Sequence, residues 1–226
     1  VVSDLKQQTA GTRPIKPPFR VIYSNDFTNT GISTPWHKRG EPFQPDHLRA
    51  SVREAKGASV HMLQPAHGAV PWWPSKLYTL DEHHAWWARN FGIEPARLRF
   101  PGVHQYVLDG GDPFNDFVDE CRKVGQKPFI SMRLNDIHHL HHAETPRNTR
   151  GIHSISRFYV EHPEWRLGPV GSGLDWSVPE VRQHMFAFIE EICGKYDIAG
   201  FELDFMRFPK FFKDDVPVDR RIEIIT

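Results

Sequence analysis

The sequence has few cysteines, no long apolar run and no net charge, and each of these limits what the protein can be. Its 226 residues include 28 Lys plus Arg and 28 Asp plus Glu, so no overall field favours nucleic acid or an acidic membrane surface. No apolar run approaches the length of a membrane span, and the first residues lack the apolar segment of a signal peptide. We therefore expect neither a nucleic-acid nor a membrane partner.

The only two cysteines are Cys121 and Cys193, and each falls inside a predicted helix. They do not have the paired spacing of a zinc site, which indicates two buried thiols and no disulfide. With 39% hydrophobic residues, the chain is long enough to bury one sizeable core. Residues 1–18 are rich in proline and predict an extended arm, followed by one domain over residues 19–226.

Four stretches predict strands, and helical periodicity follows or separates them. The strand signals cover residues 19–26, 58–64, 127–136 and 200–209. The helical patterns cover residues 45–56, 81–90, 113–124 and 179–192. Alternating strands and helices predict an α/β fold with a parallel sheet. Four such units are half of a (β/α)8 TIM barrel, and the last residues begin another helix, so we expect roughly the first four β/α units of a barrel that is incomplete at its C-terminus.

The last predicted strand carries two carboxylates in an alternating pattern. Phe201, Leu203 and Phe205 alternate with Glu202 and Asp204, which predicts one apolar face and one acidic face. In a parallel barrel the acidic face points inward. Asp204 then lies near the carboxyl end of the strand, where such barrels keep their active sites.

Aromatic and imidazole side chains are unusually frequent, with 7 Trp, 16 Phe and 14 His. Such rings stack on the apolar faces of sugars as readily as they fill a core, and loops after barrel strands carry function. Alternation also puts Arg133 on one strand face together with Asn135. The candidate substrate contacts are Asn25, Trp36, His37, Gln64, His67, Trp72, Trp73, Arg133, Asn135, His138, Trp176 and Arg207.

A run of histidines raises the question of a metal. His138, His139, His141 and His142 lack the His-Glu-x-x-His arrangement of a helical zinc site and have no companion carboxylate spacing. The sequence therefore predicts no metal and no cofactor. A metal-dependent hydrolase that uses His61, His67, His138 and Asp204 is kept as an alternative.

Two segments carry a resemblance to a known family. Residues 176–182 (WSVPEVR) and 195–209 (KYDIAGFELDFMRFP) resemble bacterial family 10-like glycosyl hydrolase domains. There, a helix that opens with Pro-Glu-Val-Arg leads to a Tyr-Asp-x-x-Gly-x-x-x-Asp strand that ends in an aromatic residue and proline. Residues 131–138 (SMRLNDIH) resemble the third-strand motif of related carbohydrate-active barrels. The likeness covers about a third of the chain, and Phe201-Glu202 replaces the Ile-His often seen before the aspartate.

The resemblance implies a (β/α)8 glycoside hydrolase that acts on a polysaccharide, with Asp204 at the position of the nucleophile. Glycoside cleavage uses two carboxyl groups that flank the scissile bond. Glu202 lies deeper in the barrel and is expected to support Asp204, so the acid/base is expected on a later strand, with Asp136 as the candidate within this chain. A catalytically inactive sugar-binding barrel is a second alternative. Frequent Arg and His in the loops also suggest sulfate or carboxylate groups on the substrate, and we expect a secreted or periplasmic protein.

Overall fold

A parallel sheet of four strands organises the protein. The computed structural model describes residues 21–32, 37–38, 40–65, 67, 69–97, 102–144 and 151–226, so the predicted N-terminal arm lies outside the described residues. The strands are β1 (Ile22–Asp26), β2 (Val60–Gln64), β3 (Lys127–Arg133) and β4 (Gly200–Asp204). They lie in the order β1-β2-β3-β4, and every neighbouring pair is parallel. Each predicted strand segment contains an observed strand, but β3 and β4 end at Arg133 and Asp204, before the predicted ends at residues 136 and 209. The strand order is consistent with a partial α/β barrel.

Helices connect the strands. They are α1 (Phe27–Ile32), α2 (Pro45–Glu54), α3 (Leu80–Phe91), α4 (Gly102–Leu108), α5 (Pro113–Lys123), α6 (Arg157–Glu161), α7 (Pro179–Lys195) and α8 (Val218–Ile225). Short 3-10 turns cover Pro95–Arg97, Leu140–His142 and Pro163–Trp165. None of the helices described here is long and apolar enough to cross a membrane.

Local signals explain where the principal helices begin. Thr79 caps α3 in a capping box with Glu82, and Asp112 caps α5 by accepting two backbone N–H groups. At the start of α7 the cap position is Val178, without a side-chain bond. Just before it, Asp175 accepts the backbone N–H and the hydroxyl of Ser177, so it forms a turn that leads into the helix.

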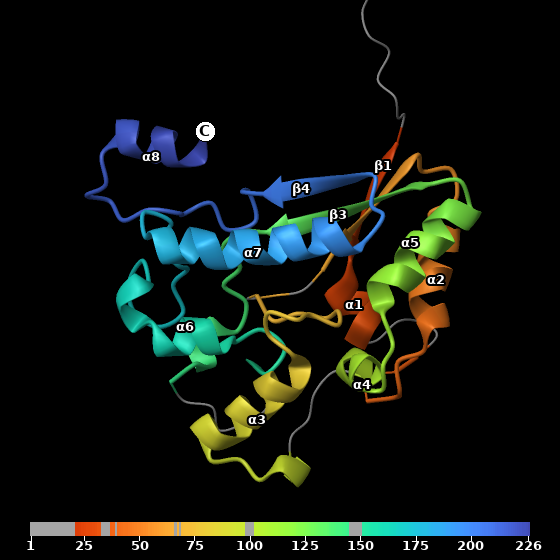
Figure 1. Ribbon diagram of the computed structural model, residues 1–226, viewed down its shortest axis with the longest axis horizontal. Coiled ribbons are helices and arrows are strands. Elements are labelled where there is room, and N and C mark those ends of the chain that lie inside the picture. Colours follow the sequence, from red (N-terminus) through yellow and green to blue (C-terminus); the bar gives the residue numbers. More distant parts are fainter. Residues whose placement is uncertain are drawn as a thin grey trace, which may run out of the picture.

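One face of the sheet is covered by helices and holds the core. Leu63, Ile130 and Met132 alternate toward this face and belong to a cluster that includes Val52 of α2 and Phe188 of α7. Figure 1 shows α5 and α7 lying against this side of the sheet, while the opposite side of the strands carries no helix layer. Burying the apolar half of each strand against these helices is the main stabilising contribution.

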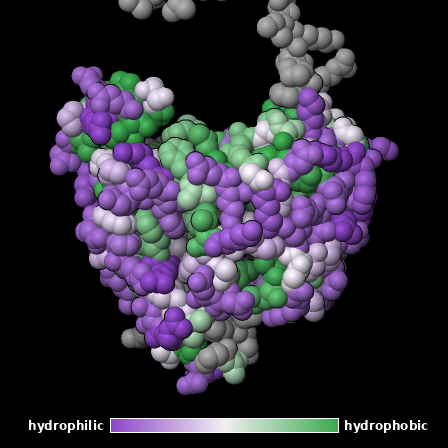
Figure 2. All heavy atoms as spheres, in the orientation of Figure 1, coloured by the Kyte–Doolittle hydropathy of each residue, from purple (hydrophilic) through white to green (hydrophobic). Residues whose placement is uncertain are grey.

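The opposite face carries the charged side chains of the strands, although Val60, Gln64 and Ser131 on the same face are buried. By strand pairing it carries Asp26, Ser131, Arg133, Glu202 and Asp204. We call this the inner face, because it would face the interior of a closed barrel. Large exposed apolar side chains also occur on β1, β4 and α8, and Figure 2 shows apolar atoms gathered between α8 and the strands.

The tryptophans predicted to stack on a sugar are core residues. Trp72, Trp73 and Trp176 are 0%, 2% and 3% exposed. Trp73 stacks on Phe114, with ring centroids 5.2 Å apart, and its indole N–H donates to Glu191 at 2.9 Å. None of the three rings has a free face for a ligand, so that expectation is corrected: the loops fold back and use their rings as core. Trp36 lies outside the described residues.

The two cysteines differ. Cys121 on α5 is buried, as predicted, whereas Cys193 on α7 is exposed, and the two are not bonded to each other. The helical pattern predicted both helices, but it did not predict that Cys193 lies on the solvent-exposed side of its helix.

Candidate functional site

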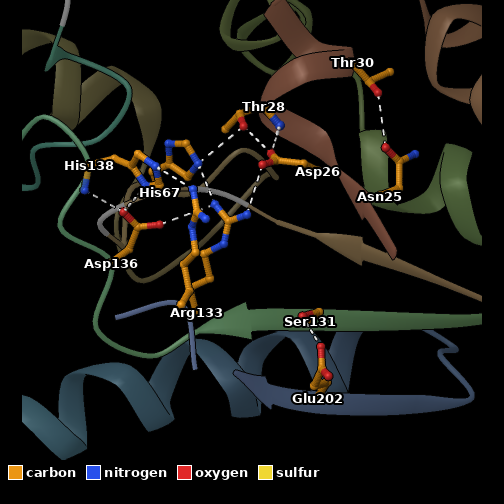
Figure 3. A network of polar contacts seen from close by, with 11 residues as sticks. Asn25, Asp26, Thr28, Thr30, His67, Ser131, Arg133, Asp136, His138 and Glu202 are labelled. Carbon is orange, nitrogen blue, oxygen red and sulfur yellow. Dashed lines mark hydrogen bonds and ion pairs between the residues drawn. The ribbon is translucent and has the colours of Figure 1, made fainter. Parts of the chain in front are cut away.

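A cluster of charged and imidazole side chains lies where β1, β2 and β3 end. It consists of Asp26 at the end of β1, His67 after β2, and Arg133, Asp136 and His138 at and after the end of β3. We call these five residues the inner cluster. Figure 3 shows their side chains pointing toward one another from three separate segments. The carboxyl ends of neighbouring parallel strands meet at one edge of a sheet, which is why residues so far apart in sequence converge.

Arg133 is the centre of the inner cluster. Its Nη2 donates to Oδ2 of Asp26 at 3.0 Å, and its Nη1 donates to Nε2 of His67 at 3.0 Å. The same Nη1 lies 3.6 Å from Oδ2 of Asp136. The Arg133 side chain is only 12% exposed. The guanidinium group is therefore held by two carboxylates and cannot serve as a free grip for a sulfate or carboxylate on a substrate, as its sequence position suggested.

Asp136 and His138 form a closely bonded pair. Oδ1 of Asp136 accepts both the backbone N–H and the Nδ1–H of His138, each at 2.8 Å. The His138 ring stacks on His67 with centroids 4.3 Å apart and contacts Phe208 edge-on at 5.1 Å. Its Nε2 lies 3.4 Å from Nη2 of Arg207. The ring of His138 is thus fixed on several sides.

The environment sets the charge of the cluster. Burial is the largest single influence on the pKa of Asp136 and acts to raise it, but the hydrogen bond from the His138 side chain, together with smaller contributions from His67 and the backbone N–H of His138, lowers the net pKa. At Asp26 burial also acts to raise the pKa, while Thr28 and Arg133 lower it below its usual value. Burial lowers the pKa of His67 to about 4. At neutral pH the cluster therefore holds two carboxylates, one guanidinium and a neutral His67.

These charges bear on Asp136 as the candidate acid/base. Its side chain is 2% exposed, and its lowered pKa keeps it ionised. A general acid must carry a proton and reach the leaving group. The expectation that Asp136 itself is the acid/base is therefore corrected, because it is a buried carboxylate whose oxygens face His138 and Arg133.

The cluster also contains residue types that bind metals. His67, Asp136 and His138 each offer one ligand atom, and these atoms lie within 4.8 Å of one another. However, the guanidinium cation of Arg133 contacts both His67 and Asp136. The two imidazole planes are also nearly parallel, 11° apart and stacked, whereas a shared ion must lie in the plane of each ring it binds. The arrangement is therefore better suited to the guanidinium group of Arg133, as the cation between these side chains, than to a metal ion.

Asp204 lies at the end of β4 on the inner face, beside Arg133 in the strand register. Its Oδ1 accepts the backbone N–H groups of Met206 and Arg207 at 2.8 and 3.1 Å. Among the described residues, Asp204 makes no ion pair, and its Oδ2 has no hydrogen-bond donor. One carboxylate oxygen is thus fixed by the backbone and the other is open.

Glu202 lies two residues earlier on the same face of β4. It accepts a hydrogen bond from the hydroxyl of Ser131, its partner in the register between β3 and β4. Figure 3 shows this pair on β3 and β4, apart from the inner cluster. Glu202 is therefore deeper along the strands than Asp204, as the strand spacing predicted.

Some predicted residues face away from the site. Asn25 is buried and donates to Ser51 of α2 at 2.9 Å, so it points toward the helices, and its role as a substrate contact is corrected. His61, part of the metal-dependent alternative, is fully buried, lies 3.3 Å from Gln126 and contacts Phe117 of α5. Residues of a strand alternate between faces, so Asp26, and not Asn25, reaches the inner face.

Other predicted contacts are placed as follows. Asn135 uses its amide to bind the backbone of Leu174 in both directions and the carbonyl of Lys210, so it joins two loops and has little left for a ligand. His37 is buried and stacks on His47 at 3.9 Å. Gln64 is buried at the end of β2, opposite Asp26 in the register.

A groove lies next to the Asp136–His138 pair. Its lining residues are Ile137, Leu167, Gly168, Pro169, Ser172, Gly173, Phe208, Pro209 and Lys210. Phe208 also contacts the ring of His138, so one lining residue of the groove touches the inner cluster. Mainly apolar lining with a few polar groups is typical of small-ligand sites.

Asp26 is the residue of the site that the sequence did not single out. Its signal was present, because it ends the first predicted strand and is followed by Thr28, whose backbone N–H it accepts at 3.0 Å. Selecting it required the strand register, which assigns Asp26 and Arg133 to the same face.

Comparisons with known proteins identify no family for this chain. No protein-family model matches it, and no curated protein matches it. Among solved structures it is similar to a maltogenic alpha-amylase, AmyB, from Thermotoga neapolitana, with 16% identity and a TM-score of 0.43 over 90% of this chain and 41% of that one. An alpha-amylase from Lactobacillus plantarum has 18% identity and a TM-score of 0.44, over 90% and 40% of the two chains.

A third similar structure is the GH36 alpha-galactosidase AgaA from Geobacillus stearothermophilus, with 13% identity and a TM-score of 0.43 over 90% of this chain and 24% of that one. The chain thus spans between about a quarter and two-fifths of the length of these structures. All three proteins are glycoside hydrolases by name. Similarity at this level identifies neither a substrate nor catalytic residues, and the resemblance to family 10-like domains stays a prediction.

Proposed function

We propose that this chain forms part of the catalytic barrel of a glycoside hydrolase and that Asp204 is its nucleophile. The observation that carries the proposal is the geometry of Asp204: a carboxylate at the carboxyl end of an inner-face strand, with Oδ1 held by two backbone N–H groups and Oδ2 without a donor among the described residues. A nucleophile needs one oxygen free to attack and a fixed orientation for that attack.

The surroundings support the same reaction. Glycoside cleavage passes through an oxocarbenium-like transition state, which a nearby carboxylate stabilises. The inner cluster adds two carboxylates and one guanidinium at the ends of β1 and β3. The groove beside Phe208 offers an apolar wall for a sugar ring.

The test is a screen of the protein's full chain against neutral and sulfated polysaccharides and against aryl glycosides of common sugars. Asp204→Asn should lower kcat by about 10³-fold or more, since it removes the attacking oxygen. Asp197→Asn is the matched control, because Asp197 is an exposed carboxylate just before the same strand, and it should keep wild-type activity.

Two results would contradict the proposal. Near wild-type turnover by Asp204→Asn would remove Asp204 from the mechanism. Sugar binding without turnover by the wild-type chain would instead identify a catalytically inactive carbohydrate-binding barrel. A 2-deoxy-2-fluoro glycoside of the active sugar sharpens the test, because it should leave a covalent adduct on the peptide that contains Asp204.

A further inference from the structure

We propose that His138 is the group that moves the proton in this reaction, and that Asp136 is a positioning residue that orients the imidazole ring. The inference rests on the proposed function, since it assigns the acid/base that the glycosidase needs. It differs from the sequence-based expectation, in which Asp136 itself, or a carboxylate on a later strand, had that role.

The hydrogen bonds fix both the tautomer and the direction of the ring. Nδ1 of His138 lies 2.8 Å from Oδ1 of Asp136, and a carboxylate can only accept. Nδ1 therefore carries a proton, which leaves Nε2 as the nitrogen that exchanges one. The backbone N–H of His138 binds the same oxygen at 2.8 Å, so the carboxylate is locked relative to the ring that it orients.

The exposed fractions of the two side chains support different roles for Asp136 and His138. The Asp136 side chain is 2% exposed and that of His138 is 27% exposed. The carboxylate is thus out of reach of a substrate, whereas the ring has an accessible edge. Nε2 lies 3.4 Å from Nη2 of Arg207, a long contact with an exposed side chain. An oxygen of a bound sugar could replace that contact at little cost.

Other groups around the ring are few and defined. His67 stacks on one face, and His139 lies 6.3 Å away, centroid to centroid. Arg207 approaches from the segment after β4. Asp136 holds Nδ1, and Arg207 is the group nearest to Nε2, so the edge of the ring that carries Nε2 faces the segment after β4.

His138 and Asp204 lie at the same end of the sheet. Arg207 connects them, since its backbone N–H donates to Oδ1 of Asp204 at 3.1 Å and its Nη2 contacts His138. Arg133 connects them a second time, because it is opposite Asp204 in the strand register and 3.6 Å from Asp136. The two groups are thus joined through two arginines, and Phe208, which lines the groove, contacts the ring of His138.

The chemistry balances without a further reactant. In the first step Nε2–H of the His138 imidazolium gives its proton to the glycosidic oxygen as the C1–O bond breaks, and an oxygen of Asp204 forms a bond to C1. In the second step Nε2 takes a proton from water as that water's oxygen bonds to C1 and Asp204 leaves. His138 and Asp204 return to their starting states, and one glycosidic bond is hydrolysed.

The activity test compares two leaving groups in the protein's full chain. The probes are phenyl and 2,4-dinitrophenyl glycosides of the sugar found in the Asp204 screen. His138→Gln should lower kcat/KM for the phenyl glycoside by about 10²- to 10⁴-fold. It should change kcat/KM for the dinitrophenyl glycoside less than about tenfold, because that leaving group departs without a proton. Azide should accelerate the variant by replacing water in the second step. His141→Gln, a change at an exposed histidine of the neighbouring turn, is the control.

The outcomes separate this inference from the proposed function. An equal loss for both leaving groups would mean that His138 has only a structural role, and would overturn the inference while leaving Asp204 as the nucleophile. Activity retained in Asp204→Asn would overturn the proposed function itself.

A second measurement needs no substrate. In ¹⁵N NMR spectra of the histidine side chains, neutral His138 should be the Nδ1–H tautomer, and Asp136→Asn should change its tautomer ratio while the amide spectrum remains that of a folded protein. An Nε2–H tautomer in the wild-type protein would overturn the orientation on which the inference depends.

Discussion

The two faces of the central sheet are built from the same four strands but have opposite character. On the helix-covered face, Leu63 and Ile130 are fully buried. On the inner face, Ile22 is 53% exposed, and Ser131, Glu202 and Asp204 follow one another along β3 and β4. The covered face therefore holds the fold together, and the inner face holds the chemistry.

The comparison teaches where a parallel α/β protein can tolerate charge. Over the central strands β2 and β3 the covered face is packed against α2, α5 and α7, so an ionised group there would lose its hydration. The inner face keeps its carboxylates either open, as at Asp204, or paired, as at Asp26 and Asp136 with Arg133. Substitutions on the two faces should therefore have different consequences for stability and activity.

The largest expected effect on stability is on the covered face. Ile130→Ala should lower the free energy of unfolding by about 3–4 kcal/mol, because it leaves a cavity in a packed core. Ile22→Ala, on the inner face of β1, should cost less than about 1 kcal/mol, since that side chain is already half in solvent. Urea unfolding of both variants checks this. Similar losses in the two variants would mean that the inner face is as well packed as the covered one.

The sequence predicted the strands because the physical signal is local. Alternation of Phe201, Leu203 and Phe205 with two carboxylates is visible without any tertiary contact, and β4 was confirmed at Gly200–Asp204. Helices that lie among glycines and prolines were not predicted. These are α1 (Phe27–Ile32), α4 (Gly102–Leu108) and α6 (Arg157–Glu161), each too short for a clear helical period.

The site was harder to predict because it depends on register and on loop paths. Asn25 and Asp26 are both polar and both end β1, and only pairing with β2 decides which one faces inward. Trp72 and Trp73 were expected at a ligand because their segment is a loop, and loops that fold back on the core give the same composition. The Asp136–His138 bond spans two residues, yet a histidine-rich run gives no sign of which ring a carboxylate will hold.

An intermediate loss of stability is expected when a histidine on the covered face becomes protonated. Burial lowers the pKa of His61 from 6.5 to about 4, and its Nε2 has no hydrogen-bond partner among the described residues. The unfolded chain therefore takes up more protons than the folded one between pH 6.5 and 4, so stability falls as the pH falls through that window. At pH 5 this amounts to about 2 kcal/mol for this imidazole.

The measurement compares urea unfolding at pH 7.5 and pH 5 for the wild type and His61→Gln. The variant should lose about 2 kcal/mol less than the wild type between the two pH values. His141→Gln, which changes an exposed histidine, should keep the wild-type pH dependence. An unchanged pH dependence in His61→Gln would mean that His61 is protonated in the folded protein, and that the covered face accepts a charge after all.

The smallest effect is expected from a polar pair on the inner face. Ser131 is buried and donates to Glu202, whose side chain is exposed. Ser131→Ala should cost only about 0.5–1 kcal/mol in urea unfolding, because Glu202 can exchange the lost bond for water. Ser131→Val is the second variant, since it adds volume on the same face. It should also be tolerated if the inner face is open, whereas a loss of several kcal/mol would mean that Ser131 packs against a filled interior. That result would reverse the comparison, because both faces of β3 would then be core.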